Sequence, residues 1–151
     1  MTVNHSHLLK VAAILWIIWG LVHMFAGLMT IGQDTSEAVA GIADAVNSSL
    51  LENDYHPAVG ALINQHGFNL LWIGAFTVVG GVFIWRGSVT AIFMTAIVGW
   101  VTDVGYFVFM DLGGFVHFVP GTVMTIISSA AVAISLWAYS TGMRPQSDPA
   151  A

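Results

Sequence analysis

The sequence predicts an all-α integral membrane protein that folds as a four-helix bundle, with residues 1–151 forming a single membrane domain. Composition is the first reason. Hydrophobic residues make up 57% of the chain and charged residues only 7%, whereas soluble domains carry about 25% charged residues. The second reason is that the apolar residues gather in four stretches, each long enough to cross a bilayer as a helix. The lipid bilayer is therefore the expected surrounding of this chain.

The first predicted span covers residues 8–31. It is too long for the apolar core of a signal peptide, and no small-residue cleavage site follows it. We therefore interpret it as a retained signal-anchor helix. The other three predicted spans cover residues 61–85, 90–110 and 115–139, and residues 142–151 are predicted to form a disordered tail.

Residues 32–59 have a different character, because this segment contains acidic residues but no Lys or Arg. Asp34, followed by Glu37 three residues later, resembles the capping arrangement at the start of a helix. Ala38 and Ile42 then provide an apolar face. The segment is thus predicted to be the first extracytoplasmic loop and to contain a short amphipathic helix lying at the membrane interface.

The positive charges predict the orientation of the bundle. In a four-span arrangement Lys10, Arg86 and Arg144 all fall on one side of the membrane, and the acidic loop falls on the other. Cytoplasmic segments carry an excess of Lys and Arg. We therefore expect both termini in the cytoplasm, and the inner membrane of a bacterium as the location.

Charge and cysteine content exclude several classes of function. The net charge is −5 and there is no basic cluster, so a nucleic-acid partner is not expected. The chain has no cysteine, which excludes disulfides, thiol redox chemistry and Cys-ligated metal sites. No phosphate-binding loop or serine nucleophile motif is present either.

Each predicted span has one face on which small and polar residues recur at helical spacing. In lipid such faces are expected to turn inward, where close packing and hydrogen bonds are available. In span order, the residues on these faces are Trp16, Gly20, His23 and Gly27; His66, Asn69, Thr77 and Gly80; Thr95, Gly99, Asp103 and Tyr106; and His117, Gly121, Thr125 and Ser128.

The depth of these residues follows from the helical rise of 1.5 Å per residue. His23 and Asp103 come out at one level, so they are predicted to meet. Polar residues of the neighbouring spans lie further toward the outer surface, by about 5 Å for Asn69 and Tyr106 and about 10 Å for His66 and His117. The bundle is therefore predicted to have a polar interior in its outer half.

This pattern predicts a pocket that binds a lipophilic small molecule, with His23 and Asp103 as a catalytic, proton-handling pair. A carboxylate beside an imidazole fixes the tautomer and favours the imidazolium, as a general base requires. The aromatic residues around the pair, Trp19 among them, suit an apolar ligand. The residues expected to bind it are Trp16, Gly20, His66, Asn69, Trp72, Trp100, Tyr106 and His117.

Two alternative functions also agree with the sequence. In one, His66 and His117, which share a level, bind haem or a divalent metal in a redox component of a membrane complex. A single metal site using His23 as well is disfavoured, because metal–ligand bonds are near 2 Å and the axial spread is about 10 Å. In the other alternative, the polar residues only hold helices together in a non-catalytic assembly protein, within a homo-oligomer or a larger complex.

Overall fold

The computed structural model describes residues 5–43 and 46–142, which form helices and no β-strand. Four helical segments are long and apolar enough to cross a membrane, namely His5–Gly32, Pro57–Trp85, Val89–Asp111 and Phe118–Gly142. The predictions of an all-helical fold and of four apolar spans are confirmed, with boundaries a few residues from those expected. Arg144 and the predicted tail beyond Gly142 lie outside the described residues.

The first long helix, α1 (His5–Gly32), is followed by a short helix, α2 (Thr35–Ala43), and a 3₁₀ turn, η1 (Ser48–Leu51). Asp34 starts α2, since its Oδ1 accepts hydrogen bonds from the backbone N–H groups of Ser36 at 2.8 Å and Glu37 at 3.1 Å. Such a cap satisfies N–H groups that have no partner within the helix. The placement of α2 in an extracytoplasmic loop stays a prediction.

The second long helix, α3 (Pro57–Trp85), packs along α1 with very close backbones. A Cβ atom added to Gly20 would lie 2.5 Å from the carbonyl oxygen of Gly74, and one added to Gly74 would lie 2.5 Å from that of Gly20. Only glycine permits this distance on both sides. Small residues at such positions allow the close helix packing that holds membrane bundles together.

The third span consists of two α-helices that alternate with two π-helical turns. They are α4 (Val89–Thr95), η2 (Ala96–Trp100), α5 (Val101–Tyr106) and η3 (Phe107–Asp111). Four residues make slightly more than one turn of an α-helix and slightly less than one turn of a π-helix. Where the two alternate, these deviations offset each other and residues four apart stay on one face. Thr95, Gly99 and Asp103 have this spacing, and all three are buried.

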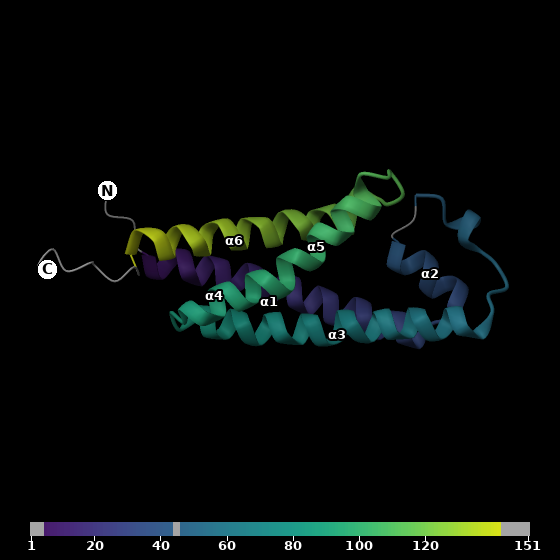
Figure 1. Ribbon diagram of the computed structural model, residues 1–151, viewed down its shortest axis with the longest axis horizontal. Coiled ribbons are helices and arrows are strands. Elements are labelled where there is room, and N and C mark those ends of the chain that lie inside the picture. Colours follow the sequence, from purple (N-terminus) through teal and green to yellow (C-terminus); the bar gives the residue numbers. More distant parts are fainter. Residues whose placement is uncertain (1–4, 44–45, 143–151) are drawn as a thin grey trace, which may run out of the picture.

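The fourth span begins with a π-helical turn, η4 (Phe118–Thr122), and continues as α6 (Val123–Gly142). Its buried face carries Ser128, Ala131, Ser135 and Ala138. The end of α6 meets the start of α1, where Thr141 Oγ1 lies 3.3 Å from His5 Nδ1. Both described chain ends therefore lie at one end of the bundle, here named the terminal end, opposite the α2 end (Figure 1).

The helices are packed unevenly along the bundle. The third span starts beside α3, through α4, and finishes beside α6, through α5 (Figure 1). Toward the α2 end the bundle therefore divides into an α1–α3 pair and an α5–α6 pair. The hydrophobic core consists of Leu9, Ala13, Trp16, Trp19, Ile84, Ile92, Ala131 and Ala138. Dense packing at the terminal end thus leaves the α2 end as the place where space can open.

The close packing of α1 on α3 gives a first testable prediction. Gly20→Ala should lower the free energy of unfolding by about 1–3 kcal/mol, because the new methyl group meets a backbone oxygen that cannot move aside. Unfolding of the purified protein by SDS in mixed micelles measures this. Gly105→Ala is the matched control, since no heavy atom lies within 4 Å of its added Cβ. Equal losses in the two variants would contradict the prediction.

Candidate functional site

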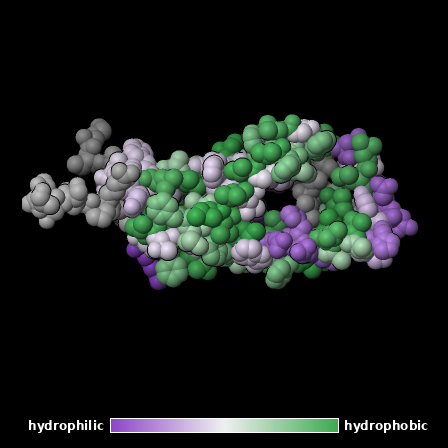
Figure 2. Space-filling model, viewed as in Figure 1, coloured by the Kyte–Doolittle hydropathy of each residue, from purple (hydrophilic) through white to green (hydrophobic). Residues whose placement is uncertain are grey.

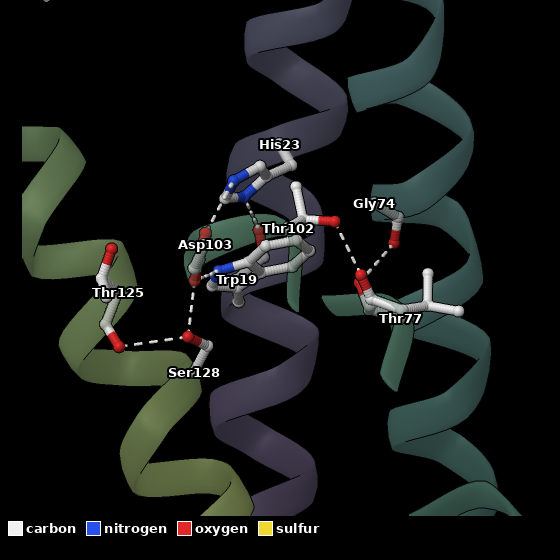
Figure 3. A network of polar contacts seen from close by, with 9 residues as sticks. Trp19, His23, Gly74, Thr77, Thr102, Asp103, Thr125 and Ser128 are labelled. Carbon is white, nitrogen blue, oxygen red and sulfur yellow. Dashed lines mark hydrogen bonds and ion pairs between the residues drawn. The ribbon is translucent and has the colours of Figure 1, made fainter. Parts of the chain in front are cut away.

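The carboxylate of Asp103 connects three helices near the middle of the bundle. Asp103 belongs to α5 and is only 3% exposed. Its Oδ2 accepts a hydrogen bond of 2.7 Å from the indole N–H of Trp19, on α1, and one of 2.5 Å from the hydroxyl of Ser128, on α6 (Figure 3). A carboxylate in an apolar span is costly to bury without such partners.

His23 lies next to this carboxylate and is held by the same tryptophan. Its ring stacks on the ring of Trp19, with centroids 3.6 Å apart and planes 19° from parallel. Its Nδ1 lies 2.8 Å from the backbone carbonyl oxygen of Trp19. A carbonyl oxygen can only accept, so Nδ1 carries a hydrogen and donates it. The other ring nitrogen, Nε2, then faces Asp103 (Figure 3).

The contact between His23 and Asp103 joins Nε2 to Oδ1 at 3.8 Å. This distance suits an ion pair but exceeds the usual hydrogen-bond range of about 2.7–3.2 Å. Two lone pairs that face each other repel, so the contact is favourable when one proton resides on the pair. The proton is carried either by Nε2, giving an imidazolium and a carboxylate, or by Oδ1, giving two neutral groups.

A cavity of about 340 Å³ borders this pair at the α2 end of the bundle. His23 and Asp103 line it together with Tyr106 and His66. The surface is hollowed between the two helix pairs at this end (Figure 2). The remaining lining residues are mostly apolar and come from α1, α2, α3, η4, α6 and the link between α1 and α2: Val22, Phe25, Ala26, Met29, Thr30, Gln33, Gly41, Leu70, Pro120, Gly121 and Met124.

Four of the residues predicted from the sequence to form the site therefore line one cavity: His23, His66, Asp103 and Tyr106. Two other predicted residues, Trp16 and Gly20, lie closer to the terminal end, in the packed part of the bundle. Trp16 is fully buried and meets Trp19 edge-on, with ring centroids 5.9 Å apart. Gly20 packs against α3. These two residues pack against Trp19 and α3, respectively, and do not line the cavity.

The remaining predicted ligand-binding residues lie elsewhere. Trp72 is 44% exposed and donates a hydrogen bond of 3.1 Å to Asn69, on the side of α3 away from its glycine contacts with α1. Trp100 is 39% exposed and donates to Ser129 at 3.0 Å. His117 is exposed just before η4. None of these four residues lines the cavity.

The positions of the histidines bear on the metal and haem alternative. Within residues 5–43 and 46–142, no group of three or more His, Asp and Glu side chains is arranged to hold a metal ion. His66 lines the cavity and His117 does not. The arrangement therefore offers no support for these two histidines as joint ligands of a metal or a haem.

Two hydrogen-bond partners of Asp103 were not recognised from the sequence, namely Trp19 and Ser128. Signals for both were present. Trp19 precedes His23 by one helical turn and so shares its face, and Ser128 belongs to the polar face of the fourth span. Helical spacing shows which residues share a face, but it does not say which donor reaches a given carboxylate.

Comparisons of the chain with protein-family models, with curated proteins and with solved structures found no match. A functional proposal for this protein therefore rests on the geometry of the site.

The hydrogen bond between Ser128 and Asp103 gives a second prediction. Ser128→Ala should lower the free energy of unfolding by about 1 kcal/mol, which is typical of an interhelical hydrogen bond in a membrane protein. Ser135→Ala is the matched control, because Ser135 is also buried on α6 but donates only to carbonyl groups of its own helix. SDS unfolding compares the two variants. A loss as large for Ser135→Ala would show that the contact with Asp103 contributes nothing.

Proposed function

We propose that this protein binds a lipophilic small molecule in the cavity at the α2 end, and that His23 and Asp103 hold the polar end of that molecule and exchange a proton with it. The observation that carries this proposal is the position of the pair, because a buried histidine and a buried carboxylate from different helices border the same cavity. Ionisable residues within apolar spans commonly mark functional sites.

The cavity has the properties of a small-molecule site. Its volume of about 340 Å³ lies within the range of roughly 300–1,000 Å³ that is usual for ligand pockets. Such pockets have apolar walls and a few polar groups that orient the ligand. Here the walls are built mainly from aliphatic, aromatic and methionine side chains, and the polar groups converge from α1, α3 and α5.

The His–Asp pair suits acid–base chemistry. Trp19 orients both members, through its carbonyl group to His23 and its indole N–H to Asp103. A general base must be held within reach of the proton that it takes, and a third group commonly orients it. The atoms that can take up or release a proton, Nε2 and Oδ1, belong to residues that line the cavity.

The same features weigh against a purely structural role for the polar residues. Contacts from Trp19 and Ser128 to Asp103 would suffice to hold three helices together. They do not account for a second pair of polar atoms, Nε2 and Oδ1, on residues that border an open cavity. A haem-binding role instead predicts a Soret band in the visible absorption spectrum of the purified protein.

The proposal includes an orientation in the inner membrane of a bacterium, with both termini in the cytoplasm. Lys10 lies over the ring of Trp85 at 5.5 Å, and Arg86 follows directly, so both cations belong to the terminal end. The acidic residues Asp34 and Glu37 belong to the α2 end. An excess of positive charge on the cytoplasmic side favours this orientation, which would open the cavity in the outer half of the membrane.

Filling the cavity tests ligand binding without touching the polar pair. In Ala26→Phe a large ring replaces a methyl group of the lining, so we expect the variant to lose any lipophilic molecule that the wild-type protein retains. Native mass spectrometry of protein released from the membranes of the expressing cells detects such a molecule as an added mass. Leu28→Phe is the control, because Leu28 lies on the same helix but is 56% exposed on the outside. The same added masses in all three proteins, or none in any, would contradict the proposal.

Single cysteines test the orientation, since the natural chain contains none. Ser49→Cys places a thiol beyond α2, and Ser6→Cys places one at the start of α1; both positions are exposed. In intact cells whose outer membrane has been made permeable, a membrane-impermeant maleimide should label Ser49→Cys only. Both variants should react after cell lysis. Labelling of Ser6→Cys alone in intact cells would reverse the orientation.

A further inference from the structure

His23 Nε2 and Asp103 Oδ1 face each other, and these two atoms limit which polar group the ligand can carry. This inference rests on the proposed function. We infer that the polar end of the ligand is a neutral hydroxyl group, as in a lipophilic alcohol or phenol, which bridges His23 Nε2 and Asp103 Oδ1. The hydroxyl donates to one of these atoms and accepts from the other.

Of the four polar atoms of the pair, two are engaged by other groups of the protein. Nδ1 of His23 donates to the carbonyl oxygen of Trp19, and Oδ2 of Asp103 accepts from both Trp19 and Ser128. These bonds hold the imidazole and the carboxylate in place from the side of α1 and α6. The atoms with which the two residues meet are Nε2 and Oδ1, 3.8 Å apart. A ligand that interacts with the pair must therefore form its hydrogen bonds with this one nitrogen and this one oxygen.

The charges around the cavity determine which protonation state of the pair is favoured. No Lys or Arg is among the described residues that line the cavity, and Lys10 and Arg86 lie at the terminal end. An isolated negative charge inside an apolar bundle is strongly unfavourable. The pair of His23 and Asp103 is neutral as a whole when it holds one proton, and this is the state that the surroundings favour.

That single proton determines the hydrogen-bonding pattern of the pair. Whether it resides on Nε2 or on Oδ1, the pair presents one donor and one acceptor. A hydroxyl group is both a donor and an acceptor at one oxygen atom. With hydrogen bonds of about 2.8 Å to each side, one oxygen atom can span the 3.8 Å between Nε2 and Oδ1. A hydroxyl group thus matches both the distance and the hydrogen-bonding pattern.

Other head groups match less well. An ether or ketone oxygen only accepts, so it leaves the acceptor of the pair without a donor. A carboxylate adds a second negative charge beside Asp103. The apolar body of the ligand is expected to contact Phe25, Met29, Leu70 and Met124, which line the same cavity.

The inference is tested with three probes that share a ten-carbon chain: decanol, methyl decyl ether and decanoate. Saturable binding of radiolabelled decanol is measured on the full-length protein in lipid nanodiscs, with empty nanodiscs as the background. The unlabelled compounds then compete with it. We expect the ether and decanoate to compete about tenfold more weakly than decanol, since the ether cannot donate a hydrogen bond and decanoate adds a negative charge beside Asp103.

His23→Phe checks that the preference comes from the pair. A phenyl ring can keep the stacking on Trp19 but has no Nε2. The buried Asp103 then holds a proton of its own and offers a donor, which an ether accepts as well as an alcohol does. The preference for decanol over the ether should therefore fall toward one. His7→Phe, an exposed position at the start of α1, is the control and should keep the preference.

The possible outcomes separate the inference from the proposed function. Equal competition by the ether in the wild-type protein, or tighter binding of decanoate than of decanol, would overturn the hydroxyl inference while leaving a lipophilic ligand in place. An unchanged preference for decanol in His23→Phe would also overturn the hydroxyl inference, because a group other than His23 would then bind the hydroxyl. The absence of saturable decanol binding, together with no added mass on the purified protein, would overturn the proposed function as well.

Discussion

The rest of the structure depends on the hydrogen bonds that Asp103 Oδ2 accepts from Trp19 and Ser128. A carboxylate within a helix that is apolar enough to cross a membrane requires donors from other helices, since lipid offers none. Meeting this requirement brings α5 toward α1 and α6 rather than along α3. The third span consequently crosses the bundle from one neighbour to the other, and the helices separate into two pairs where the cavity lies.

The two pairs differ in how they are held together. The α1–α3 pair relies on backbone contact at Gly20 and Gly74, where the helices leave no room for a side chain. The α5–α6 pair relies on side chains and contains the π-helical turns. Polar residues that line the cavity come from both pairs, so the contact between His23 and Asp103 exists only when the whole bundle is assembled.

Much of this arrangement was predictable from the sequence. The number of spans follows from their length and composition, and the meeting of His23 with Asp103 follows from the constant rise of a helix. The positions of Asn69, Trp72 and His117 were harder to predict, because a helical wheel assumes straight helices around one common axis. A bundle that divides into pairs gives each helix a different inward direction, and Asn69 and Trp72 fall on the outside of α3.

The bond from His23 Nδ1 to the carbonyl group of Trp19 has a further consequence. An imidazole conducts protons across a barrier by receiving one at one nitrogen and releasing another from the opposite nitrogen. Here the opposite nitrogen is tied to the backbone of its own helix, so a proton that arrives at Nε2 also leaves from Nε2. The residue is thereby suited to returning a proton to the side from which it came, and not to carrying protons through the membrane.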